Sequence, residues 1–108
     1  MFARILEIVP KMEKKEELIQ FAKKEILPIL RKQYGFLEIL PFVPEVKNEK
    51  YVTITLWNGK KDFERYEREW FPKVEEMVKP YLNAPIVVRN HYTVETTLCE
   101  HFEKALAA

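Results

Sequence analysis

Apolar residues run together, or alternate with polar ones, in several stretches that have the length of β-strands. Residues 2–9 are rich in aliphatic and β-branched side chains, and Pro10 ends this stretch because proline cannot donate a ladder hydrogen bond. Residues 36–43 are almost continuously apolar, whereas residues 51–57 alternate aliphatic residues with threonine. These patterns predict three strands, the last two of which form a hairpin.

A fourth strand is predicted over residues 86–95, after Pro85. Because successive side chains of a strand point to opposite faces, strict alternation divides this segment into two sets. It places Val88, Asn90, Tyr92 and Val94 on one face, and Val87, Arg89, His91 and Thr93 on the other.

The segment between the first two strands has helical periodicity. Over residues 13–33, apolar side chains recur at steps of three and four with Lys and Glu between them. Pro28 removes one main-chain hydrogen bond, which predicts a kink or break over residues 24–27. Gly35 then supplies the left-handed position that commonly ends a helix.

A second helix is predicted after the turn at Asn58 and Gly59. Pro72 should bend or split this helix near Trp70, and Pro80 should end it. Residues 97–108 begin with a capping-box pattern, which predicts a short C-terminal helix. The apolar stripe of the second helix consists of Phe63, Tyr66, Trp70, Val74, Met77 and Tyr81.

The order strand, helix, strand, strand, helix, strand predicts an α+β protein with the ferredoxin-like βαββαβ plan, in which both helices cover one face of an antiparallel sheet. The second strand lies at a sheet edge in this plan, and Pro41 within that strand favours the same position. We expect a single domain over residues 1–108, with its core in residues 2–96 and a helical tail over residues 97–108.

Two helices can cover only one face of the sheet, yet the first two strands are apolar on both faces. The uncovered face would expose a larger apolar patch than a monomer normally carries. We therefore expect a homodimer in which two sheets face each other.

Composition and charge argue against several kinds of binding partner and several kinds of site. The net charge of +1 gives no field suited to a polyanion, so we expect no nucleic-acid partner. Charges at Arg4, Glu7 and Lys11 interrupt the N-terminal apolar run, which predicts a cytoplasmic protein without a signal peptide or membrane span. The single cysteine, Cys99, excludes an intrachain disulfide, and its spacing from the two histidines does not match a zinc site.

The chain lacks the residues that several classes of enzyme need for catalysis. The chain has no serine, so it has no serine nucleophile, and its two isolated glycines cannot build a Gly-rich phosphate loop. The sequence thus predicts neither a serine hydrolase nor a Rossmann dinucleotide site.

Two motifs carry a resemblance to a known family. YGF at the end of the first helix leads into the long hairpin, and VTITLWNGKKDFERY places a tryptophan at the end of the third strand ahead of a helix with an aromatic stripe. This succession resembles the antibiotic biosynthesis monooxygenase (ABM) family of dimeric α+β barrel proteins, over residues 2–96. The resemblance implies a dimeric α+β barrel and, in members that act on small molecules, a cavity between the sheet and the helices.

The candidate residues for lining such a cavity are polar or aromatic. His91 is the candidate general base, because an unperturbed imidazole has a pKa of about 6.5. If strand alternation holds, Arg89 and His91 share a face and can orient an anionic or enolic oxygen together. Trp57, Tyr66, Trp70 and Tyr92 are candidate walls for an apolar or aromatic ligand, or core residues; Arg4, Glu38 and Asn90 are further candidates.

The haem-degrading branch of the family is distinguished by an asparagine on the first strand, a tryptophan in the second helix and an iron-ligating histidine about ten residues later. Here the first strand has no asparagine, Tyr66 lies near the tryptophan position, and Glu75 and Glu76 lie at the histidine position. We therefore expect no haem, and no other cofactor or metal is predicted.

Three functions remain open. The first is a cofactor-independent monooxygenase in which His91 acts as base beside an aromatic pocket. The second is a non-catalytic dimer that binds a small apolar or aromatic ligand or has a structural or stress-related role. The third is another chemistry on the same fold, such as isomerisation or decarboxylation.

Overall fold

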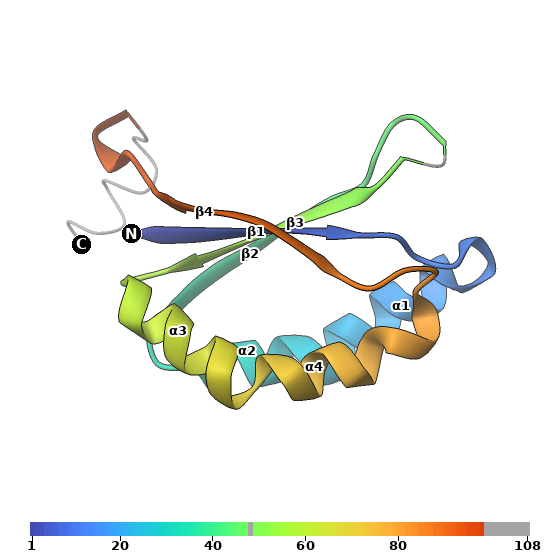
Figure 1. The fold of residues 1–108 in the computed structure, drawn as a ribbon, viewed down its shortest axis with the longest axis horizontal. Helices are drawn as coiled ribbons and strands as arrows, with labels where there is room; N and C mark the ends of the chain where they lie inside the picture. The colour runs from blue at the N-terminus through green and yellow to red at the C-terminus, as the bar shows by residue number, and fades with distance from the viewer. Residues whose placement is uncertain (48, 99–108) are drawn as a thin grey trace.

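The computed structural model describes residues 1–47 and 49–98. Four strands and two helical arms follow one another in the predicted order (Figure 1). The strands are β1 (Phe2–Ile8), β2 (Phe36–Phe42), β3 (Tyr51–Trp57) and β4 (Val87–Thr93), and the helices are α1 (Lys15–Phe21), α2 (Leu27–Arg31), α3 (Lys60–Glu69) and α4 (Phe71–Val78).

The strands form one antiparallel sheet in the order β2-β3-β1-β4. Both helical arms lie on the same face of this sheet, as Figure 1 shows. The predicted α+β class and ferredoxin-like plan are confirmed. Pro41 sits on β2, an edge strand, where its missing N–H removes no bond from the interior of the sheet.

The first helical arm changes geometry at the predicted place. A short 3-10 turn, Met12–Lys14, leads into α1, and a π-helical turn, Ala22–Ile26, joins α1 to α2. Leu27 N–H bonds to the carbonyl of Ala22, five residues back, immediately before Pro28. A proline cannot continue the regular ladder, so the wider turn accommodates it without ending the arm.

The second helical arm divides where the sequence predicted. Trp70 separates α3 from α4, and Pro72 lies in the first turn of α4, where its missing N–H costs no helical bond. A 3-10 turn, Lys79–Tyr81, contains Pro80 and ends the arm. Residues 96–98 form a further 3-10 turn, and the rest of the predicted C-terminal helix lies outside the described residues.

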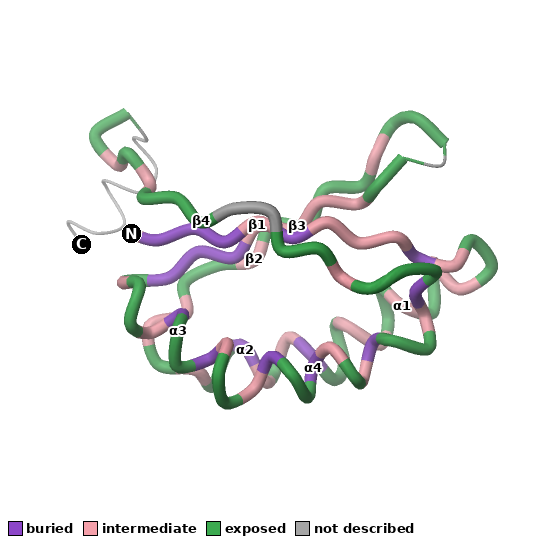
Figure 2. Tube along the Cα trace, in the orientation of Figure 1, coloured by how far each residue is buried: buried purple, intermediate pink, exposed green. Residues whose placement is uncertain are grey.

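The hydrophobic core fills the space between the sheet and the two arms; the first residues of β1 are buried, and buried positions recur along the arms (Figure 2). Trp57 is the largest fully buried side chain, with 0% of its surface exposed. Its ring packs against Phe36, Phe63 and Tyr66. Its Nε1–H donates a hydrogen bond to Thr55 Oγ1 at 3.1 Å, so the buried indole N–H is satisfied.

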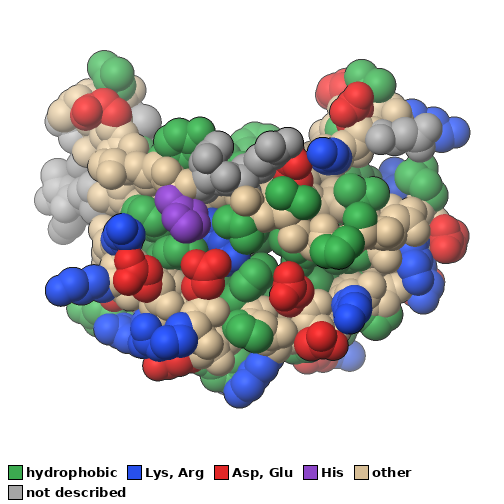
Figure 3. All heavy atoms as spheres, viewed as in Figure 1, with side chains coloured by type: hydrophobic (Ala, Val, Ile, Leu, Met, Phe, Trp, Pro, Cys, Tyr) green, Lys and Arg blue, Asp and Glu red, His purple; other side chains and the backbone are tan. Residues whose placement is uncertain are grey.

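The opposite face of the sheet is not covered by the helices and is strongly apolar. Its centre is formed by Ala3 and Leu56, which are paired with each other and buried by their neighbours. Exposed apolar side chains extend from this centre toward both sheet edges, including Leu40, Phe42, Val87 and Tyr92. The helical side differs, because blue and red side chains alternate over the arms in Figure 3.

Strand β4 departs from the predicted alternation. Asn90 pairs with Ile5 and Val88 pairs with Leu6, so Arg89 is an unpaired extra residue in a β-bulge. In consequence His91 shares the helix-facing side with Val88, and the predicted grouping of His91 with Val87 is wrong. The side chains of Arg89 and Asn90 lie outside the described part of the structure.

Within residues 1–47 and 49–98, no helix is both long and apolar enough to span a bilayer.

Candidate functional site

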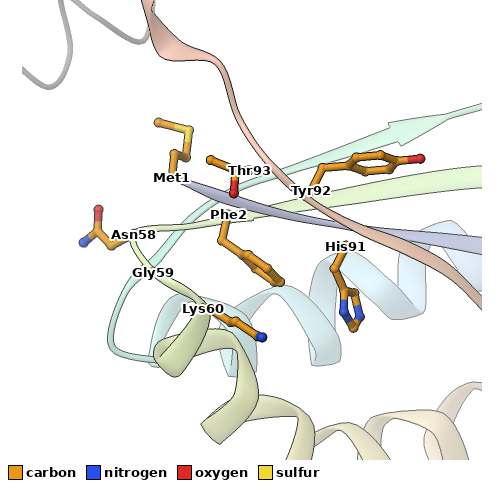
Figure 4. Close-up of a pocket in the computed structure, with 8 residues that line it drawn as sticks. All are labelled: Met1, Phe2, Asn58, Gly59, Lys60, His91, Tyr92 and Thr93. Atoms are coloured by element: carbon orange, nitrogen blue, oxygen red, sulfur yellow. The ribbon is translucent and has the colours of Figure 1, made fainter.

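A surface pocket lies at one end of the sheet, where β1 begins, β4 ends and α3 starts. Its volume is about 390 Å³, and it opens to solvent. Figure 4 shows Phe2 and His91 extending toward the helices, whereas Tyr92 leaves β4 on the opposite side. The residues that line the pocket are Met1, Phe2, Asn58, Gly59, Lys60, His91, Tyr92 and Thr93.

His91 is held in place by strand register and by aromatic contacts. It pairs with Arg4 across β1 and β4, so both side chains belong to the helix-facing side of the sheet. The imidazole centroid lies 5.0 Å from the Phe63 ring and 5.6 Å from the Phe2 ring. These contacts fix one side of the ring while the residue stays exposed to the pocket.

The other predicted wall residues lie elsewhere. Trp57 and Tyr66 are buried in the core, 0% and 4% exposed, and their rings contact each other with centroids 5.1 Å apart. Trp70 is half-buried between α3 and α4, with Lys73 Nζ 4.9 Å from its ring centroid. Of the predicted site residues with described side chains, His91 and Tyr92 line the pocket.

A buried cation, Arg4, lies beside His91 on the neighbouring strand. Arg4 is 1% exposed, and its Nη2 donates to Glu67 Oε1 at 3.1 Å. The guanidinium carbon lies 3.9 Å from the Phe71 ring centroid and 5.0 Å from that of Phe63, both within the range of cation–π attraction. A charged residue among Phe2, Leu6 and Ile8 on an otherwise apolar strand face was the sequence signal for this group.

Burial shifts the pKa values of two neighbouring side chains, Arg4 and Tyr66. Desolvation lowers the pKa of Arg4, and the nearby Glu67 carboxylate partly opposes that change. Desolvation also raises the pKa of Tyr66 to about 12, which Arg4 partly offsets. The Tyr66 phenol is therefore neutral at physiological pH.

The pocket thus combines one exposed imidazole with aromatic walls, and a buried guanidinium adjoins it. An imidazole can remove a proton from a bound molecule, and aromatic walls favour a flat apolar one. In the described part of the chain, no three side chains of His, Cys, Asp or Glu come together as a metal site would require.

Comparisons with known proteins agree with this architecture. No protein-family model matches the sequence, and no curated protein matches it. Among solved structures, a candidate antibiotic biosynthesis monooxygenase from Nitrosomonas europaea superposes with a TM-score of 0.70 at 13% identity, over 87% of this chain and 89% of that chain. Another from Caulobacter crescentus CB15 gives a TM-score of 0.71 at 11% identity, over 87% and 90% of the two chains.

A conserved protein from Methanosarcina mazei Go1 also matches, with a TM-score of 0.69 and 18% identity over 88% of this chain and 94% of that chain. At such identities the likeness establishes the fold and leaves the activity open. The chain therefore has the α+β fold of the antibiotic biosynthesis monooxygenases.

Proposed function

We propose that this protein binds a small aromatic molecule in the pocket at His91 and oxidises it with molecular oxygen, without a cofactor. The observation that carries the proposal is the position of His91, which lines this pocket and contacts the rings of Phe2, in the pocket, and Phe63, in the core. The ABM-like fold supports it, because structures with this fold include proteins described as monooxygenases.

The proposed reaction needs electrons from the substrate alone. His91 removes a proton from an activated CH₂ group, and the resulting carbanion gives its electrons to O₂. The CH₂ becomes C=O and the second oxygen atom leaves as water, so the balance is R₂CH₂ + O₂ → R₂C=O + H₂O. The protein positions the substrate between the aromatic walls of the pocket and supplies His91 as the base.

Replacing His91 tests the proposal. His91→Ala should lower the rate of oxygen uptake with an anthrone-type tricyclic ketone by about 10²- to 10⁴-fold, the usual contribution of a general base. An oxygen electrode measures this rate directly. His101→Ala is the matched control, because it removes the only other histidine of the chain. If His91→Ala turns over at the rate of the unmodified protein, His91 is not the base.

A binding protein without catalysis is the second candidate, and a specific observation favours it. Trp57 and Tyr66, which the monooxygenase hypothesis needed as pocket walls, fill the core between the sheet and helices. These two side chains therefore do not contribute walls to the open pocket at the end of the sheet. Ligand binding without oxygen uptake would support this second function.

We also propose that the protein is a homodimer whose partners pack through their uncovered sheet faces. The apolar side chains of that face support this arrangement, because burying them against a second copy removes them from water. Light scattering should then give twice the mass of one chain.

Two matched substitutions test the dimer. Leu40, on the uncovered sheet face, and Ile19, on α1, are similarly exposed, at 37% and 40%. Leu40→Glu should convert the dimer to a monomer at micromolar concentration, because it places a charge in the interface. Ile19→Glu should leave the mass unchanged. A dimer that persists in Leu40→Glu would exclude this face as the interface.

A further inference from the structure

The buried guanidinium of Arg4 carries a hydrogen-bond donor that the fold does not use. Nη2 donates to Glu67, but no acceptor among the described residues lies within hydrogen-bond distance of the buried Nε. A buried donor on a charged group is costly to leave unsatisfied, so an oxygen atom of a bound molecule that reaches Nε would be stabilised there.

The geometry of the guanidinium limits what that acceptor can be. Nε and Nη2 project from the same edge of the planar group, and Glu67 takes Nη2. A single oxygen atom can therefore bind Nε without displacing Glu67. The carboxylate beside it disfavours a second negative charge, so the geometry favours a neutral hydroxyl or carbonyl oxygen over an anion.

Arg4 does not line the pocket, but it is next to two residues that do. Phe2 and His91 line the pocket, and Arg4 follows Phe2 by two residues on β1 and pairs with His91 on β4. Both Arg4 and His91 contact the Phe63 ring, each at 5.0 Å. The imidazole of His91 is exposed and contacts Phe2 and Phe63, so a ligand ring can take over these aromatic contacts when the imidazole shifts within the pocket.

We propose that Arg4 Nε binds an oxygen atom of the ligand and thereby selects aromatic molecules that carry a hydroxyl or carbonyl group. This inference rests on the proposed ligand pocket. The imidazole of His91 shifts within the pocket and stays beside the ligand, the ligand ring lies against Phe2 and Phe63, and its oxygen reaches Nε. Arg4 is then the residue that determines ligand specificity, and it remains paired with Glu67 throughout.

The Nε–H group reports on this bond directly in ¹⁵N–¹H NMR. Arg4→Lys identifies the resonance, because the variant lacks it. Addition of 2-naphthol to the wild-type protein should shift the Arg4 Nε–H proton downfield, whereas naphthalene, which has no oxygen, should perturb pocket amides but leave that resonance in place. A merely structural arginine would show the same Nε–H position with both probes.

Affinity gives the second readout. Wild-type protein should bind 2-naphthol about tenfold more tightly than naphthalene, and Arg4→Met should reduce this ratio to near one. Equal affinities in the wild type, or an Nε–H resonance unmoved by 2-naphthol while pocket amides shift, would overturn the role of Arg4 and leave the pocket standing. If neither probe shifts the pocket amides, the aromatic pocket and the role of Arg4 both fail.

Discussion

Trp57→Ala is expected to lower the free energy of unfolding by about 3–5 kcal/mol, the usual cost of replacing a large buried aromatic residue by alanine. The side chain is completely buried and packs against Phe36, Phe63 and Tyr66. Its loss creates a cavity between the sheet and the helices and leaves Thr55 Oγ1 without its indole donor. Urea unfolding followed by circular dichroism measures the change without depending on tryptophan fluorescence.

Trp70→Ala is the matched control, because it removes the only other tryptophan of the chain. Trp70 is half-buried at the junction of α3 and α4 and packs at the margin of the core, so its loss should cost about 1–2 kcal/mol. Equal losses in the two variants would contradict the placement of Trp57 at the centre of the core.

Gly35→Ala is expected to destabilise the protein by more than about 2 kcal/mol, for two separable reasons. Gly35 has a φ of +84°, a conformation that costs a non-glycine residue about 1–2 kcal/mol. A Cβ at this position would also overlap the side chain of Asp62, in the first turn of α3. Denaturant unfolding measures the sum of both terms.

A double-mutant cycle with Asp62→Gly separates these terms, because it removes the overlapping side chain and leaves the backbone conformation to act alone. The cost of Gly35→Ala should fall by the overlap term in that background. The control is Gly59→Ala: the backbone of Gly59 is extended, and the nearest atom to an added Cβ is Asp62 Oδ2 at 3.8 Å. This variant should cost less than about 1 kcal/mol, even though Gly59 precedes α3 as its cap.

The fold followed from local signals that act through backbone chemistry. Pro28 and Pro72 marked the places where the helical arms change geometry, and Pro41 marked an edge strand. In each case the missing N–H constrains the main chain wherever the residue occurs, so the inference needs no knowledge of distant contacts. Apolar periodicity then supplied the element order, and with it the sheet topology.

The site was harder to predict, because its residues depend on packing. Trp57 and Tyr66 are large aromatics in amphipathic patterns, and such patterns are identical for a core and for a cavity wall. The structure places both in the core. Arg4 was visible as a charge on an apolar strand face, but its pairing with Glu67 and its unused donor depend on how α3 packs on the sheet.

The bulge in β4 has a consequence for comparing this sequence with its relatives. The unpaired residue Arg89 divides β4 into two short segments, and the alternation of side chains between the two sheet faces restarts after it. Just beyond the end of β4, the Val94 N–H donates a hydrogen bond to the carbonyl of Met1, just before β1, at 2.9 Å. An alignment of this strand with one that lacks the extra residue therefore needs a gap at the bulge, and positions such as His91 should be counted backward from Val94.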